Sequence, residues 1–339
     1  MIKRIQTYSL KNHNTFGINV LADEFIEYST TEELISLLKE EKLRATKLLS
    51  IGSGSNMLFI SDFNGIVLHS KISDILLELE TDKEVVVSAG AGIIWDDFVI
   101  WCINQGFGGI ENLSNIPGTV GAAVIQNIGA YGVELKDIFH KVEGIFIDNC
   151  EKFCFYQTDC DFNYRYSIFK GQLKDKAIIT KLFLKLNKKP KFNIEYAALK
   201  SQLEKEKDEL SLKKIREVII SIRKSKLPDP EIVGNAGSFF KNPIISLQDF
   251  IKIEKNYPKI PFFETSQKNF RKIPAAWLIE KAGWKGKQLG NAGVHSQQAV
   301  VLVNLQNANG KEILKLACEI EKDIEQKFGI LLEREVNVI

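Results

Sequence analysis

The stretch Gly52-Ser53-Gly54-Ser55-Asn56 decides how the first half of this chain is interpreted. It lies between two short apolar segments, 47–51 and 57–60, that are typical of β-strands. The spacing differs from the Gly-x-Gly-x-x-Gly pattern of a Rossmann domain, and the sequence contains no P-loop pattern, so both folds are disfavoured. Consecutive small residues can present backbone N–H groups to a phosphate, but a tight turn explains the same residues.

A second glycine-rich segment, 106–132, favours the interpretation that these loops bind a phosphate-bearing ligand. Two of its parts, 116–123 and 126–132, combine glycines with small residues that let a ligand approach the backbone closely. Thr119 and Asn127 can donate hydrogen bonds to such a ligand. Two loops of this kind favour a long ligand such as a dinucleotide, and the alternative is a glycine-rich packing loop.

Outside these loops the hydrophobic pattern predicts separate strands and helices without strict βαβ alternation. A capping box from Thr30 to Glu33 begins a helix with Leu34, Leu37 and Leu38 on one face. Further helices are expected at 95–105, 210–224, 246–255, 275–282 and 311–328. Strands are expected at 66–69, 84–89, 138–147, 177–186, 299–304 and 331–339. The charged run 204–217 is interpreted as a solvated helix face, and a domain boundary is placed near Pro228. The fold class is therefore α+β.

Composition narrows the class of protein. Lysine and arginine number 45 against 43 acidic residues, a net charge of +2, which gives no reason to expect nucleic acid or a membrane surface as partner. The amino terminus has no secretory pattern, no apolar run is long enough to span a bilayer, and the five cysteines suggest neither a disulfide framework nor a metal site. We expect a cytoplasmic chain with reduced cysteines and without metal.

Three places offer chemically useful side chains. Arg165 lies among aromatic residues in the stretch 162–167, where stacking can hold a guanidinium that forks onto carboxylates. Ser238 lacks the Gly-x-Ser-x-Gly elbow of serine hydrolases, so proton donation is its more plausible use. Glu333 and Glu335 alternate onto one face of the expected last strand. Each has a structural alternative: a surface arginine, a turn serine and solvated carboxylates.

Taken in order, these motifs closely resemble the UDP-N-acetylenolpyruvoylglucosamine reductase (MurB) family, type I. The resemblance runs from about residue 14 to the end of the chain. Its motifs are Asn14-Thr15-Phe16-Gly17, 52–56, 109–113, Ile116-Pro117-Gly118, 126–132, Tyr164-Arg165-x-Ser167, 226–230, 237–243 and Leu332-Glu333-x-Glu335-Val336.

The resemblance implies an FAD-binding fold of the vanillyl-alcohol-oxidase (PCMH) type and a separate α+β substrate-binding domain. It implies an FAD-binding region at 1–220, split near residue 70, a substrate-binding domain at 221–328, and a terminal strand at 329–339 that carries the catalytic glutamate. NADPH would be the reductant, the substrates would be small molecules, and the chain would act as a monomer.

The resemblance also implies roles for individual residues. The catalytic set would be Arg165, Ser238 and Glu335. Cofactor contacts would come from Gly52, Ser53, Gly54, Ser55, Asn56, Met57, Pro117, Gly118, Thr119, Gly121, Asn127, Gly129, Ala130, Ile178 and Arg223. Substrate contacts would come from Tyr164, Tyr196, Lys241, Asn242, Lys285 and Gln298.

One departure from the family pattern is Arg334, where many relatives have proline between the two glutamates. Without proline, the segment has an additional backbone N–H group and a different rigidity. The orientation of the Glu335 side chain is therefore less certain than in those relatives. Two other functions remain as alternatives: an oxidase of the same flavin fold, and a non-catalytic protein that binds nucleotide sugars.

Overall fold

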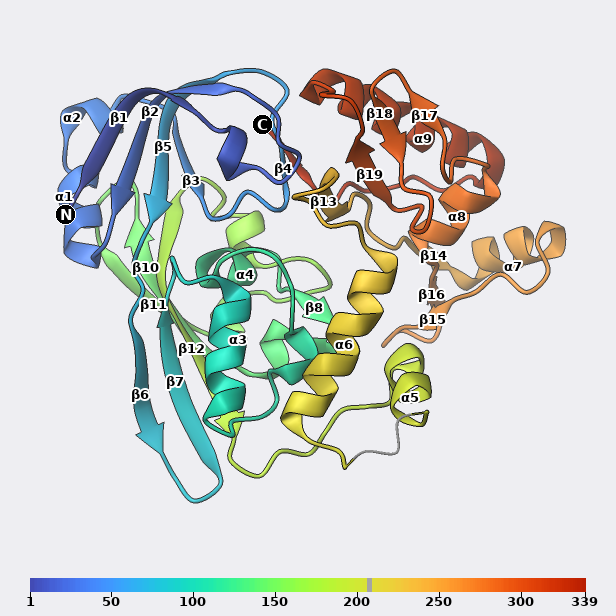
Figure 1. Ribbon diagram of the computed structural model, residues 1–339, viewed down its shortest axis with the longest axis horizontal. Helices are drawn as coiled ribbons and strands as arrows, with labels where there is room; N and C mark the ends of the chain where they lie inside the picture. Colours follow the sequence, from blue (N-terminus) through green and yellow to red (C-terminus); the bar gives the residue numbers. More distant parts are fainter. Residues whose placement is uncertain (206–208) are drawn as a thin grey trace. The chain divides into compact units, whose positions relative to one another are not determined.

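The computed structural model describes residues 1–205 and 209–339. The chain forms two compact units, and Figure 1 colours it along the sequence. Unit 1 comprises residues 1–9, 21–54 and 63–225, and unit 2 comprises residues 10–20, 55–62 and 226–339. Two early segments therefore belong to the unit that contains the carboxyl terminus, which a linear division of the sequence does not anticipate. The functions expected of the two regions remain predictions.

Unit 1 begins with a sheet in the order β1-β2-β5-β3, in which β5 pairs in parallel with both neighbours. Its strands are β1 (Lys3–Ser9), β2 (Leu21–Tyr28), β5 (Phe63–Ser70) and β3 (Leu48–Ile51). The expected N-cap begins α1 (Thr31–Leu38), because the Thr30 hydroxyl accepts a hydrogen bond from the Glu33 N–H. The Glu33 carboxylate accepts from the N–H of Ser29, one residue before the N-cap, so the second half of the predicted capping box is wrong. Leu34, Leu37 and Leu38 are buried, as predicted, and the short α2 (Glu41–Arg44) follows.

The second sheet of unit 1 is antiparallel, in the order β11-β10-β12-β7-β6. Its strands are β11 (Lys152–Tyr156), β10 (Phe139–Phe146), β12 (Ala177–Asn187), β7 (Glu84–Gly90) and β6 (Ile75–Glu80). The predictions for β7, β10 and β12 are confirmed. The sequence pattern did not predict β6, whose leucines are largely exposed on an edge strand and show no alternation of burial.

Unit 1 also contains α3 (Trp95–Asn104), α5 (Ala197–Leu203) and α6 (Leu212–Lys226), and α3 and α6 lie side by side in Figure 1. Arg216 of α6 forks onto Asp96 of α3, with N–O distances of 2.6 and 2.7 Å. The expected helix at 210–224 is confirmed as α6, but it begins only at Leu212, and residues 206–208 of the charged run lie outside the described residues.

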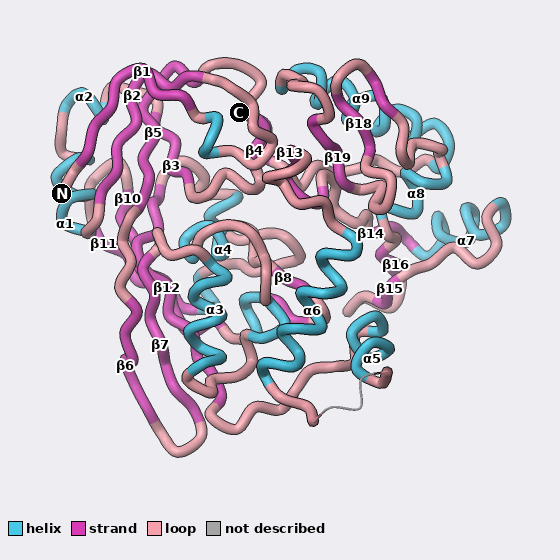
Figure 2. Tube along the Cα trace, viewed as in Figure 1, coloured by secondary structure: helices cyan, strands magenta, loops and turns pink. Residues whose placement is uncertain are grey.

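The glycine-rich segment after α3 contains only short elements, and Figure 2 shows it mostly as loop. These elements are α4 (Val120–Ile125), β8 (Gly129–Ala130) and β9 (Val133–Glu134). Close contacts explain some of the glycines: a Cβ on Gly121 would lie 2.8 Å from the Cβ of Ala91. Much of the backbone here is therefore held by packing and side-chain contacts.

Unit 2 contains a sheet in the order β13-β19-β18-β17, against which α9 packs. The sheet consists of β13 (Gly234–Ser238), β19 (Val301–Asn304), β18 (Ala292–Val294) and β17 (Gln288–Leu289). A smaller sheet consists of β14 (Ile244–Ser246), β16 (Phe270–Lys272) and β15 (Phe263–Glu264). The helices are α7 (Leu247–Asn256), α8 (Ala275–Lys281) and α9 (Gly310–Phe328), which confirms the three helices predicted for this half.

The last eleven residues do not form the single strand predicted at 331–339. Only β20 (Asn337–Val338) is regular, and it pairs in parallel with β4 (Met57–Leu58). Earlier in the segment, Arg334 forms an isolated antiparallel bridge with Phe240. The first part of the segment thus contacts Phe240 and its last part contacts β4. Alternating hydrophobicity cannot show that one segment pairs with two different partners.

Among the described residues, every helix is too short or too polar to cross a bilayer. The five cysteines are all free thiols. The part of the chain that the structure describes brings no three metal-ligating side chains together.

Candidate active site

Arg165 lies at the tip of a tight turn in unit 1. Asn163 and Tyr166 exchange two backbone hydrogen bonds of 3.1 Å across the turn, which leaves Tyr164 and Arg165 at its end. Arg165 has a φ of +54°, a left-handed conformation that costs a non-glycine residue roughly 1–2 kcal/mol. Such strain persists only where the surroundings determine it, and it is frequent at functional sites.

The guanidinium of Arg165 is held in place by its neighbours. Its Nη2 donates to the carbonyl oxygen of Gly129 at 2.8 Å, and its Cζ lies 5.3 Å from the ring centroid of Tyr164. A Cβ on Gly129 would lie 3.1 Å from Nη1 of Arg165 and 2.9 Å from Cγ of Glu134. The absence of a side chain at position 129 therefore makes room for the guanidinium.

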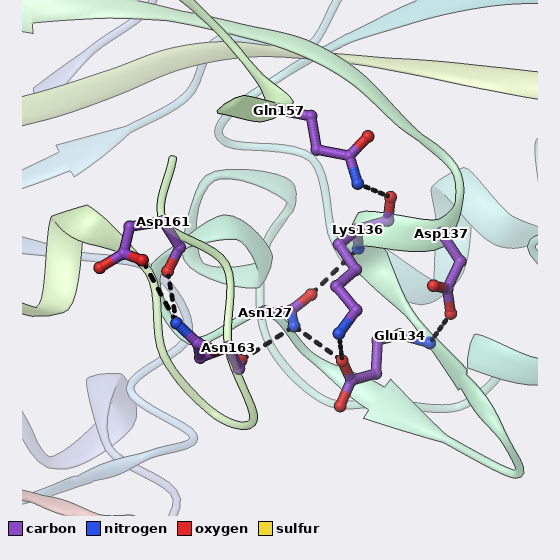
Figure 3. A network of polar contacts seen from close by, with 7 residues as sticks. All are labelled: Asn127, Glu134, Lys136, Asp137, Gln157, Asp161 and Asn163. Carbon is purple, nitrogen blue, oxygen red and sulfur yellow. Dashed lines mark hydrogen bonds and ion pairs between the residues drawn. The ribbon is translucent and has the colours of Figure 1, made fainter. Parts of the chain in front are cut away.

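Asn127 has a different role from the one predicted. Its side chain is fully buried, and its Nδ2 donates to the carboxylate of Glu134 at 3.0 Å and to the carbonyl of Asn163 at 3.1 Å (Figure 3). Its Oδ1 accepts from the backbone N–H of Lys136 at 3.0 Å. Because both amide hydrogens are used inside the protein, the prediction that this side chain donates to a ligand is wrong. Asn127 instead ties the glycine-rich loop to the turn that carries Arg165.

Arg223 of α6 is the second cation of this region. Its Nε is buried and has no hydrogen-bond partner among the described residues. Burial lowers the pKa of Arg223, and the positive charge of Arg165 lowers it further. The side chains of Tyr131 and Asp96 raise the same pKa. A half-buried arginine whose Nε is a buried, unused donor, in the field of another guanidinium, is suited to an anionic or carbonyl-bearing ligand.

The two glycine-rich loops meet within unit 1. A Cβ on Gly52 would collide with the side chain of Thr119, so these two residues are in direct contact. Gly54 and Gly118 have φ values of +63° and +125°, which other residues adopt only under strain. A close pair of loops without bulky side chains, together with the unused donor of Arg223, fits the dinucleotide that the sequence predicts.

The other cofactor residues predicted from the sequence are distributed as follows. Ser53 is half-buried in the first loop, and Ser55, Asn56 and Met57 continue it into unit 2; Pro117, exposed, and Ala130, half-buried, belong to the second loop. Ile178 is different, because its side chain is buried in the apolar cluster that contains Leu34 and Leu37 of α1. The Ile178 side chain therefore belongs to the core, and the cofactor contact expected at this residue stays a prediction.

Ser238 and Glu335 lie on adjacent segments of unit 2. Ser238 ends β13 beside an irregularity in the pairing with β19, and Gly237 before it has a φ of +66°. Such bulges often re-aim a side chain next to an active site. The N–H of Glu335 donates to the carbonyl of Phe239 at 2.8 Å, which fixes the register of the last segment against the residues that follow Ser238.

Most of the expected substrate residues of unit 2 already have protein partners. The ammonium of Lys241 is buried and pairs with Glu333, whose side chain is 72% exposed. Asn242 Oδ1 accepts from the N–H of Ala275 at the start of α8, and Lys285 pairs with Glu280 at 3.1 Å. The backbone N–H of Gln298 donates to His295 Nδ1 at 3.2 Å.

The other two expected substrate residues, Tyr164 and Tyr196, lie in unit 1. Tyr164 is the residue that packs on Arg165, and Tyr196 lies elsewhere in the unit. It precedes α5 and packs edge-on against Tyr131, with ring centroids 5.4 Å apart. Tyr131 was not predicted as a site residue, and its side chain also forms a hydrogen bond with that of Arg223. The sequence signal that could have marked Tyr131 as a site residue is that it is the one aromatic residue in the loop 126–132.

Comparison with known proteins decides the family. The UDP-N-acetylenolpyruvoylglucosamine reductase of Flavobacterium johnsoniae is 47% identical over 334 residues, covering 98% of each chain. The reductase of the same name from Bacteroides fragilis is 44% identical and covers 98% of this chain and 99% of its own. The chain belongs to the UDP-N-acetylenolpyruvoylglucosamine reductase family.

Family models agree with this membership, and a solved structure agrees with the fold. Residues 229–339 match the carboxyl-terminal domain of UDP-N-acetylenolpyruvoylglucosamine reductase, and residues 22–148 match an FAD binding domain. The crystal structure of the reductase from Thermus caldophilus covers 100% of this chain and 98% of its own, with a TM-score of 0.69 and 22% identity. The α+β fold with an FAD-binding domain, predicted from the sequence, is confirmed.

Proposed function

We propose that this protein reduces the enolpyruvyl group of UDP-N-acetylenolpyruvoylglucosamine with NADPH and FAD, forming UDP-N-acetylmuramate for peptidoglycan precursor synthesis. The observation that carries the proposal is full-length similarity at 47% identity to a reductase of that name. The protein is an FAD-dependent oxidoreductase, and its substrates are small molecules.

The catalytic residues that we propose are Arg165, Ser238 and Glu335. The two glycine-rich loops and Arg223 would hold FAD, which would supply the chemistry of hydride transfer from NADPH to one carbon of the enolpyruvyl double bond. Negative charge then develops toward the substrate carboxylate, and the fixed guanidinium of Arg165 is suited to stabilise it. Ser238 donates the proton that completes the other carbon, and Glu335 assists electrostatically or through a proton.

For the cofactor we propose the two glycine-rich loops and Arg223. The contact between Gly52 and Thr119 and the unused Nε of Arg223 support this assignment. For the substrate we propose Tyr164, Tyr196, Lys241, Asn242, Lys285 and Gln298. We further propose that residues 1–220 bind FAD, that 221–328 bind the substrate and that the segment 329–339 supplies Glu335.

We propose that the protein acts as a monomer in the cytoplasm, without a membrane or nucleic-acid partner. The near balance of 45 basic and 43 acidic residues supports the absence of a polyanionic partner. Light scattering coupled to gel filtration tests the monomer, for which the expected mass is 38.4 kDa.

The decisive experiment measures NADPH oxidation by the purified yellow protein with and without the enolpyruvyl nucleotide sugar. We expect oxidation that depends on the sugar and forms one UDP-N-acetylmuramate for each NADPH consumed. Steady hydrogen peroxide production without the sugar would indicate an oxidase instead. A colourless protein that binds the sugar but no flavin would contradict the proposal.

A further inference from the structure

Arg334 separates the two glutamates of the last segment, and its side chain is clamped onto α9. Its Nε and Nη2 contact the two carboxylate oxygens of Glu321 at 2.5 and 2.6 Å. Nη2 also lies 3.2 Å from Sγ of Cys318, one turn earlier on the same helix. This fork-to-fork geometry restricts rotation of the guanidinium far more than a single ion pair would.

The backbone on either side of Arg334 is fixed as well. The N–H of Glu335 donates to the carbonyl of Phe239, and the N–H of Lys241 donates to the carbonyl of Glu333, each at 2.8 Å. Neither of these bonds uses the N–H of Arg334. In extended backbone, successive side chains point to opposite faces, so holding Arg334 toward α9 directs Glu335 to the other face.

The helix that receives the clamp is a rigid support. α9 has 19 residues, begins with a capping box at Asn309 and Glu312, and ends at Gly329 in the left-handed conformation. It packs against β18 and β19, the central strands of the main sheet of unit 2. Glu321 therefore connects the last segment to the core of the unit.

We infer that Arg334 is a positioning residue: through its fork onto Glu321 it sets the direction in which Glu335 is presented. This inference rests on the proposed function, because it assigns Glu335 to reduction of the enolpyruvyl group. Proline limits rotation of the backbone at a single residue, and the clamp achieves a similar restriction from the side chain. Without the clamp, the segment loses its side-chain link to α9 while the backbone ladder survives.

The test compares Arg334→Met, Glu321→Gln and Arg334→Pro in the flavin-loaded protein, with Lys252→Met as the control. Lys252 forms an exposed ion pair with Asp249 elsewhere in unit 2. Rapid mixing separates flavin reduction by NADPH from flavin reoxidation by the enolpyruvyl sugar. We expect Arg334→Met and Glu321→Gln to slow reoxidation about tenfold, since small misplacements of a reacting group carry such losses, and to leave reduction unchanged. Arg334→Pro should recover most of the lost rate.

A second readout does not depend on activity. Amide hydrogen exchange of the flavin-free protein should show faster exchange at residues 333–337 in Arg334→Met and Glu321→Gln than in the parent or in Lys252→Met. Unchanged exchange, unchanged reoxidation, or equal slowing of both half-reactions would overturn the inference. If the parent itself fails to couple NADPH oxidation to the sugar, the proposed function fails instead. If Glu335→Gln reoxidises at the parent rate, the assigned role of Glu335 fails.

Discussion

The N–H of Glu335 donates to the carbonyl of Phe239, the residue that directly follows Ser238. Two of the proposed catalytic residues therefore come from neighbouring extended segments of one unit, although nearly a hundred positions separate them in the sequence. A change at either residue can be interpreted against the same local backbone. The roles of Ser238 and Glu335 can be separated by measuring flavin reduction by NADPH and flavin reoxidation by the enolpyruvyl sugar independently.

Ser238→Ala should leave flavin reduction by NADPH unchanged and slow reoxidation by the enolpyruvyl sugar about 10²–10⁴-fold, the usual contribution of a positioned proton donor. Rapid-mixing absorbance of the flavin measures both rates. Ser296→Ala is the control, because Ser296 is an exposed serine of the same unit and is not among the proposed site residues. Slow reduction with normal reoxidation would refute proton donation by Ser238.

Gly129→Ala should displace the guanidinium of Arg165, since the new Cβ would lie 3.1 Å from Nη1. We expect turnover to fall at least tenfold, because the charge that Arg165 is proposed to stabilise would lose its partner. Gly106→Ala is the control: it has a φ of +77° and no atom within 4 Å of the new Cβ. That variant should lose about 1–2 kcal/mol of unfolding free energy and keep its turnover. Parent turnover in Gly129→Ala would show that Arg165 tolerates the extra carbon.

Asn127→Asp should destabilise the protein, because a carboxylate would replace the amide that donates to Glu134 and to the Asn163 carbonyl. Both acceptors would lose their donor, and a fully buried carboxylate at position 127 would lie beside the like charge of Glu134, which costs roughly 2–4 kcal/mol. Urea unfolding measures the change. Asn149→Asp, at an exposed asparagine, should stay within about 0.5 kcal/mol of the parent. Equal stability of the two variants would contradict a structural role for Asn127.

The case of Asn127 shows where sequence reasoning reaches its limit. A buried amide and a ligand-binding amide look alike in a glycine-rich loop, and only the positions of Glu134 and Asn163 distinguish them. The same applies to the last segment, because residues 239–241 and 56–58 hold different parts of it.

Sequence patterns within one helix or strand predicted secondary structure better than they predicted contacts between distant segments. The N-cap at Thr30 and the buried leucines that follow it were predicted correctly, because helix starts depend on residues within one turn. The strands β7, β10 and β12 were found by their β-branched and apolar runs. The exposed leucines of β6 carry no such signal, since an edge strand need not alternate.

Arg223→Met should weaken flavin retention, because the unused Nε would no longer be available to the ligand. Loss of a hydrogen bond to a charged group corresponds to about 1.5–3 kcal/mol, or roughly a 10–100-fold higher dissociation constant. Fluorescence titration of the flavin-free protein with FAD measures the change. Lys224→Met, the exposed neighbour on α6, should bind FAD like the parent. Equal affinity of the two variants would remove Arg223 from the proposed cofactor site.

Asp96 should make the stability of unit 1 depend on pH in acid. Burial raises the pKa of this carboxyl, but hydrogen bonds from Arg216 and the Asn115 N–H outweigh burial and hold it below its ordinary value of 3.8. The stabilisation is therefore complete above pH 3.8 and disappears as the pH falls through the lower folded-state pKa. Asp96→Asn should reduce the unfolding free energy by about 1–3 kcal/mol at neutral pH, and the difference from the parent should shrink in acid. Asp97→Asn, at the exposed neighbour, should show no such difference in urea unfolding, and a gap that stays constant with pH would exclude the ion pair as its source.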